Sequence, residues 1–236
     1  MAGTTLTKNG WSGASSGTWN NRANVVVDTD QGIRTSGGGL IDALKGKDVI
    51  TGSRRNDPGV LIPRGRQEGE SRGSLQLGDD NDTVTGSSRN AVGIDNRGFI
   101  LTGSGQDLIT GSGSSGIRNR GFIFTQRDND TVDVRDGGIR GGGFVDLGGG
   151  RNTFIGFGDH LIYGANLDTD RLLLPKGEYT IDRSSRRRYE VERGNRRLEL
   201  IDFDQIGSIN GTRDDRINLE SSGTLVVKNN GTLSFS

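Results

Sequence analysis

Seven residues with oxygen-bearing side chains recur at fixed positions and have the chemistry to bind a cation. They are Asp48, Asp82, Asp107, Asp130 and Asn152, with Asp80 and Asp128 each two residues before one of these. If they stack at the strand spacing of about 4.8 Å, adjacent carboxylates repel by about 1 kcal/mol in water and by about 3–4 kcal/mol at an effective dielectric of 20. Calcium accepts such oxygens together with backbone carbonyls. The alternative is that the side chains accept hydrogen bonds from turn amides, with nearby arginines balancing their charge.

The elements that position these residues are five ungapped copies of one fourteen-residue phrase. The copies are Gly39–Gly52, Gly73–Gly86, Gly98–Gly111, Gly121–Val134 and Gly143–Gly156. An aliphatic residue stands two places after the first residue of each copy: Ile41, Leu75, Ile100, Ile123 and Val145. Another apolar residue follows each carboxylate or amide by two places, which is the alternation typical of strands. Each copy therefore predicts a strand, a polar turn and a second strand.

A short glycine-aliphatic element before each copy predicts a third strand. The copies start 34, 25, 23 and 22 residues apart, and the long first interval contains about nine inserted residues within 63–71. Three short strands in a period of about 22–25 residues, with glycine-rich corners, are typical of one turn of a parallel β-solenoid. We therefore expect an all-β fold, a right-handed parallel β-helix with a β-rich C-terminal cap, in which the five aliphatic residues stack inward.

The sequence divides into three predicted regions. Residues 1–23 are rich in Gly, Ser, Thr and Asn and predict a flexible or strand-donating arm, and 24–163 form the repeats. Residues 164–236 form the β-rich extension, with an antiparallel hairpin of 188–192 with 196–201 and two last strands around Asn229-Asn230-Gly231. Asp168-Thr-Asp170-Arg-Leu172 and Asp214-Asp215-Arg-Ile217 repeat the carboxylate phrase, so we expect a degenerate repeat at each.

The polar turns resemble the RTX (haemolysin-type) calcium-binding nonapeptide. The resemblance rests on Gly103-x-Gly105-x-Asp107-x-Ile109, Gly148-x-Gly150-x-Asn152-x-Phe154 and Gly78-x-Asp80-x-Asp82-x-Val84. The first glycine of the family's pair is missing in most copies, and one turn per repeat replaces the family's two. The resemblance implies calcium between adjacent repeats along a single edge, with Asn152 the poorest position, and a location outside the cell or on its surface.

Composition narrows the classes of function. The 236 residues include 30 acidic and 30 basic side chains, so net charge provides no general attraction for nucleic acid. The chain contains no cysteine, which excludes disulfides and thiolate metal sites. The N-terminus lacks the apolar segment of a cleaved signal, and no stretch reaches membrane-spanning length. We expect export without a cleaved signal peptide.

Two binding or catalytic alternatives remain. Arg34, Arg118 and Arg140, with Asp95 in the same column, could bind an acidic polysaccharide, or they form a mixed-charge surface that maintains solubility. A polysaccharide-cleaving site would need a groove with clustered carboxylates. The 63–71 insertion is the single segment that could form a wall of such a groove. We expect a non-enzymatic structural protein, a subunit of a matrix, surface layer or filament. In such a protein, copies of the chain associate through exposed strand edges.

Overall fold

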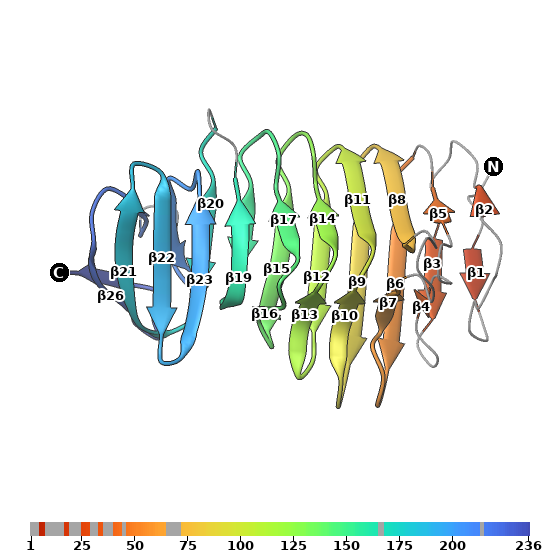
Figure 1. The fold of residues 1–236 in the computed structure, drawn as a ribbon, viewed down its shortest axis with the longest axis horizontal. Helices are drawn as coiled ribbons and strands as arrows, with labels where there is room; N and C mark the ends of the chain where they lie inside the picture. The colour runs from red at the N-terminus through yellow and green to blue at the C-terminus, as the bar shows by residue number, and fades with distance from the viewer. Residues whose placement is uncertain are drawn as a thin grey trace.

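The computed structural model describes residues 5–7, 17–18, 25–28, 33–34, 40–43, 46–64, 72–164, 168–212 and 215–236. These residues form an all-β structure with parallel strands, and no helix is assigned among them. The strands lie side by side along the long axis, with β1 and β2 at one end and β26 at the other (Figure 1).

The described strands form a ten-stranded sheet, named sheet A, and a seventeen-stranded sheet with two rows, B and C, that meet at β19. In order, sheet A contains β1 (Thr5–Thr7), β3 (Val25–Asp28), β6 (Val49–Arg54), β9 (Thr83–Ser88), β12 (Leu108–Ser112), β15 (Thr131–Asp136), β18 (Thr153–Ile155), β20 (Arg171–Leu174), β24 (Gln205–Ser208) and β25 (Ile217–Asn218). Row B contains β2 (Gly17–Thr18), β5 (Leu40–Asp42), β8 (Ser74–Asp79), β11 (Phe99–Ser104), β14 (Phe122–Phe124), β17 (Phe144–Asp146), β19 (Gly158–Tyr163), β23 (Arg196–Ile201), β22 (Arg188–Arg193), β21 (Gly177–Ser185), β26 (Gly223–Val227) and β27 (Leu233–Phe235). Row C contains β4 (Ile33–Arg34), β7 (Val60–Ile62), β10 (Val92–Asn96), β13 (Ser115–Asn119), β16 (Ile139–Arg140) and the start of β19.

From β3 to β16, each strand pairs in parallel with the strand three places later. In sheet A this gives the series β3, β6, β9, β12, β15 and β18, each paired with the next. Each copy of the phrase supplies one strand to row B and one to sheet A, and the glycine-aliphatic element supplies row C. The predicted strand-turn-strand unit and the predicted third strand are therefore confirmed.

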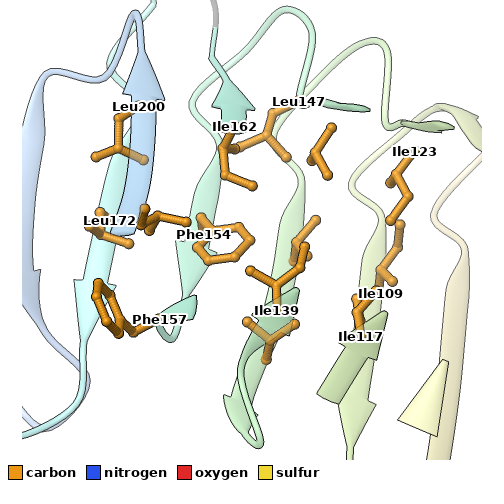
Figure 2. Close-up of a cluster of buried hydrophobic side chains, with 14 of the residues drawn as sticks. Ile109, Ile117, Ile123, Ile139, Leu147, Phe154, Phe157, Ile162, Leu172 and Leu200 are labelled. Atoms are coloured by element: carbon orange, nitrogen blue, oxygen red, sulfur yellow. The ribbon is translucent and has the colours of Figure 1, made fainter. Parts of the chain in front are cut away.

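The predicted aliphatic column is also confirmed. Ile41, Leu75, Ile100, Ile123 and Val145 are in register from one row B strand to the next, and all are buried. Sheet A adds a second buried series, with Ile50, Val84, Ile109, Val132, Phe154 and Leu172. Figure 2 shows side chains from both series together with Ile117 and Ile139 of row C. Each repeat thus needs few bulky residues to enclose a continuous core.

The glycine that ends the phrase is required by close packing of the backbone. A Cβ on Gly86 would lie 2.5 Å from the carbonyl oxygen of Gly93, and a Cβ on Gly93 would lie 2.5 Å from that of Gly86. Gly111 and Gly116 face each other in the same way in the next repeat. Because no side chain fits at these corners, four of the five copies end in glycine. The fourth copy ends in Val134, where the register between β12 and β15 shifts.

The C-terminal region follows the prediction in part. β22 and β23 form the expected antiparallel hairpin with Gly194 at φ 63°, and β26 and β27 form the final pair with Gly231 at φ 87°. Parallel pairing continues beyond 163, because β20 pairs with β18 and β24 pairs with β20.

The degenerate repeat predicted at Asp214–Ile217 is wrong. Gln205 and Ile206 of β24 occupy the next parallel position. A turn in which the Gly211 N–H donates to Ser208 O then reverses the chain, so β25, with Ile217, runs antiparallel to β24.

The predicted arm contributes backbone pairs at the N-terminal end. β1 pairs in parallel with β3, and β2 pairs in parallel with β5. The rest of 1–23 lies outside the described residues, as do 65–71 of the insertion. No helix long and apolar enough to cross a membrane occurs in the described part of the chain.

Candidate functional site: the buried acidic column

The five repeated carboxylate or amide residues form one column at the turn between row B and sheet A. The acidic column is Asp48, Asp82, Asp107, Asp130 and Asn152, extended by Asp170 and ending at Asp204. All except Asp204 are buried. The structure therefore brings five of the seven predicted site residues together and adds Asp170, from a predicted degenerate repeat, and Asp204, which was not predicted.

Each residue of the column is hydrogen-bonded to the next repeat. The N–H of Asp82 donates to Oδ1 of Asp107 at 2.8 Å, and the N–H of Asp107 donates to Oδ1 of Asp130 at 2.8 Å. The same bond joins Asp48 to Asp82 at 2.7 Å and Asn152 to Asp170 at 2.7 Å. One side-chain oxygen per residue therefore satisfies a backbone donor that the strands leave unpaired, and holds neighbouring repeats in register.

Asp80 and Asp128 lie in a second, exposed row at the same corner. The N–H of Gly46 donates to Asp80 Oδ2 at 3.1 Å, and the N–H of Gly105 donates to Asp128 Oδ2 at 3.2 Å. Asp80 and Asp128 have φ of 85° and 75°, in the left-handed region where the equivalent Gly105 and Gly150 lie. A pocket of about 360 Å³ at this corner is lined in part by Asp80, Gly105 and Asp128.

The second carboxyl oxygen of the column has different surroundings. Oδ2 of Asp82, Asp107 and Asp130 is buried and has no hydrogen-bond partner among the described residues. An unsatisfied buried oxygen is costly, and more so when it carries charge. The hydroxyls of Thr102 and Thr125 lie beside the Asp107 and Asp130 carboxyls but donate to the carbonyl oxygens of Thr125 and Leu147. In this arrangement the three Oδ2 atoms lack a donor within the described part of the chain.

Asn152 shows which kind of partner fits that place. Its Oδ1 accepts from the N–H of Asp130 at 2.9 Å, which fixes the orientation of the amide. Its Nδ2 then donates to the carbonyl oxygens of Gly148 and Gly150, at 3.1 and 3.3 Å. The equivalent turns share positive φ at 78 and 80, 103 and 105, and 126 and 128. From this equivalence we infer that Oδ2 of the aspartate in those turns takes the place of Nδ2 of Asn152 and is directed at carbonyl oxygens, which donate no hydrogen bond.

A proton on the aspartate or a cation between the oxygens would satisfy this arrangement. Burial raises the pKa of Asp82 to about 8 and that of Asp130 to about 8, with smaller contributions from neighbouring carboxylates. Burial also raises the pKa of Asp107, although the nearby Thr102 hydroxyl acts in the opposite direction. Arginines do not balance these charges, since no ion pair among the described residues involves Asp82, Asp107 or Asp130.

The column fits calcium in its oxygen donors but not as a cluster of acidic side chains. No group of three or more His, Cys, Asp or Glu side chains within the described ranges is arranged to hold a metal ion. A cation would therefore take one aspartate Oδ2 and complete its shell with turn carbonyls, which calcium accepts. Calcium binding remains a prediction.

A second buried polar ladder was not predicted from the sequence. Asn96 Nδ2 donates to Asn119 Oδ1 at 2.9 Å, and Asn119 Nδ2 lies 3.3 Å from His160 Nε2. His160 Nδ1 lies 2.8 Å from Leu161 O, and burial lowers the pKa of His160. A neutral ring that donates through Nδ1 and accepts through Nε2 fits both contacts. The contact between Asn119 and His160 joins residues 41 positions apart in the sequence, and no local motif predicts it.

The predicted arginine column has mixed charge. Asp95 is in register with Arg118, and Arg118 with Arg140. Buried Asp95 pairs with Arg97 at 2.7 Å and with Arg118 at 3.9 Å. This pairing favours the mixed-charge interpretation over a continuous basic surface.

Comparison with known proteins found no matching family model, no similar curated protein and no similar solved structure.

Proposed function

We propose that this chain is a right-handed parallel β-helix that acts as a non-catalytic structural protein outside the cell and associates with copies of itself. The acidic column supports a structural role, because its residues are buried and bonded to adjacent repeats. A general acid or base must instead reach a substrate.

The observation that carries the proposal is an aromatic strip on the outer face of row B. The strip is Phe99, Phe122, Phe124, Phe144 and Tyr163, all partly exposed. Ile100, Ile123 and Val145, the neighbours of these residues in the strands, are fully buried. The aromatic rings are therefore on the opposite, solvent-facing side. A contiguous apolar surface on a chain this polar favours a protein interface.

Ring geometry favours a protein partner over a sugar chain. Phe99 and Phe122 stack with centroids 5.1 Å apart and an interplanar angle of 12°, and Phe144 lies 4.7 Å from Tyr163. The Arg72 guanidinium lies 5.3 Å from the centroid of the Phe122 ring. Because neighbouring rings and the Arg72 guanidinium cover the faces of these rings, mainly the ring edges are exposed to solvent. Sugars stack on faces, whereas side chains of a second copy can pack against edges.

A second copy can cover the strip. A two-fold axis near β14, the strand of Phe122 and Phe124, would place the strip of one copy against the strip of its partner. Such an interface uses the same surface twice and closes as a dimer. Further assembly into a matrix or filament would use other surfaces.

Calcium is part of this proposal as a stabilising ion. Oδ2 of Asp82, Asp107 and Asp130, with turn carbonyls, would hold it, and its charge would neutralise the column when bound. The chain's own contribution is the set of N–H to Oδ1 bonds that orients each carboxyl.

Sedimentation velocity at increasing protein concentration tests the proposed association. We expect wild type to dimerise, and the Phe122→Thr/Phe144→Thr variant to stay monomeric, since threonine preserves strand propensity and removes the aromatic edges. Leu108→Thr is the matched control, because Leu108 is an exposed apolar residue on sheet A. A monomeric wild type, or a double variant that associates as wild type does, would contradict the proposal.

A further inference from the structure

Three arginines line one pocket at the C-terminal end of sheet A. The pocket has a volume of about 460 Å³ and is lined by Asn129, Arg151, Thr169, Arg171, Gln205 and Arg216. The described lining residues include no carboxylate. Three guanidinium groups, two amides and a hydroxyl form a set of hydrogen-bond donors with a net positive charge.

The chain reversal at β25 builds this pocket. Arg171 opens β20 and is in register with Gln205 of β24. On the same face of sheet A, the two preceding repeats carry Thr131 and Thr153 at this position. β25 pairs antiparallel with β24, which places Arg216, the residue before β25, beside Gln205 and Arg171. The pocket therefore forms where the repeat pattern ends.

Two of the arginines have no charge partner among the residues that the structure describes. Neither Arg151 nor Arg216 forms an ion pair with any residue in the described ranges. Nε of Arg216 is buried and has no hydrogen-bond partner within the same ranges. A buried guanidinium donor without an acceptor is costly, so an acceptor from outside the chain would stabilise this arrangement.

Carboxylates close to these arginines in the sequence are engaged elsewhere. Asp168 Oδ2 accepts from the N–H of Gly150 at 2.9 Å, and Asp215 Oδ2 accepts from the Thr212 N–H and hydroxyl. Asp204 Oδ2 accepts from the N–H of Asp170, and its Oδ1 lies 3.9 Å from Arg187. These bonds hold the acidic groups in other contacts.

We propose that this pocket binds a sulfate or phosphate group. A planar guanidinium donates two parallel hydrogen bonds to such oxyanions. A doubly charged group balances the two cations Arg151 and Arg216 better than a single carboxylate does. The volume exceeds what a free sulfate or phosphate needs, which leaves room for a carrier to which the group is esterified.

Isothermal titration of the full chain tests the site, with inorganic sulfate and inorganic phosphate as probes at constant ionic strength in chloride. We expect one saturable site in wild type, with affinity at least tenfold weaker in Arg151→Gln/Arg216→Gln. Arg140→Gln is the matched control, because Arg140 is exposed on row C and outside the pocket. It should bind as wild type does. Far-ultraviolet circular dichroism establishes that each variant is folded.

A second titration separates free anion from ester, with a monosulfated disaccharide and its unsulfated counterpart. Tighter binding of the sulfated disaccharide than of inorganic sulfate supports an ester ligand, and the reverse order supports a free anion. Two results would overturn the proposal: no saturable binding of either inorganic anion, or unchanged affinity in the double variant.

Discussion

Asp130 and Asn152 occupy equivalent places in successive repeats, and the N–H of Asp130 donates to Oδ1 of Asn152 at 2.9 Å. Asn152 then uses Nδ2 to reach two turn carbonyls, whereas Asp130 has an oxygen at the corresponding position. Both polar atoms of the Asn152 amide therefore have hydrogen-bond partners in the described part of the protein, whereas an ionised Asp130 carboxylate has such a partner for only one of its two oxygens. This difference determines what each substitution in the column should do.

Asp130→Asn should stabilise the protein at pH 8 in the presence of a chelator. The new Nδ2 donates to the turn carbonyls and removes a buried group that is costly when charged, so we expect a gain of about 1–3 kcal/mol in the free energy of unfolding. Urea denaturation provides the measurement. Asp136→Asn, at an exposed position, should change the value by less than about 0.5 kcal/mol. Destabilisation by Asp130→Asn under these conditions would count against this interpretation of the column.

Asn152→Asp should have the opposite effect. It extends the buried carboxyls by one repeat and loses the two bonds from Nδ2, so we expect a cost of about 1–3 kcal/mol at pH 8 with chelator present. At pH 5 the added carboxyl is protonated and can donate, which should remove most of that cost. An equal cost at both pH values would indicate a packing effect instead.

The pH dependence of stability follows from the raised pKa values. Burial places the pKa of Asp82 and of Asp130 at about 8, against an ordinary value of 3.8. Between these values the folded chain holds protons that the unfolded chain has released. The stabilisation is therefore fully present below about pH 4 and is lost as the pH rises through about 8, by up to about 1.4 kcal/mol per pH unit for each group.

The contribution of these two carboxyls to the free energy of unfolding can be measured by denaturation from pH 5 to pH 9 in chelator. The two proteins compared are wild type and Asp82→Asn/Asp130→Asn. The difference between the two proteins cancels contributions from other titrating groups. We expect wild type to lose stability with rising pH relative to the double variant. A relative gain would show that the column favours its ionised form.

Calcium should reverse the trend, because a cation stabilises the ionised carboxyls that the proton otherwise neutralises. At pH 8, millimolar calcium should raise the melting midpoint of wild type and leave Asp82→Asn/Asp107→Asn/Asp130→Asn unchanged. Magnesium is the matched control ion, since it requires a stricter geometry than calcium. A wild-type midpoint that does not respond to calcium would favour protonated carboxyls as the resting form.

The period-two pattern of sheet A can be tested with adjacent residues. Ile109 is fully buried and Leu108 is 36% exposed. Ile109→Ala should cost about 2–5 kcal/mol of unfolding free energy, because it leaves a cavity in a continuous core. Leu108→Ala should change it by less than about 1 kcal/mol. Similar costs at both sites would contradict the assigned register.

The repeated phrase predicts much of the fold because it carries two independent periods. The aliphatic residue and the carboxylate recur at the same offsets, so stacking any two copies aligns both columns, as Ile100 over Leu75 and Asp107 over Asp82 show. The hairpin at Gly194 is predicted equally well, since alternating strands flank a local turn signal. Where the aliphatic period and the carboxylate period coincide, the position of a residue in the sequence predicts its place in the fold.

The parts that sequence reasoning missed depend on contacts without a local signal. Asp204 continues the column after a long hairpin, so its spacing gives no clue. Asp215 carries the right phrase, but the chain has already reversed before it. The arginine pocket joins Arg151, Arg171 and Arg216 through that same reversal, and no spacing rule anticipates it.

The protonation of the buried carboxyls is measured most directly by carbon-13 nuclear magnetic resonance of the aspartate side chains, titrated in chelator. Asp82→Asn and Asp130→Asn assign the two resonances by their loss. We predict that both carboxyl carbons titrate with midpoints near pH 8. Midpoints near pH 4 for Asp82 and Asp130 in the folded protein would contradict the account of the acidic column.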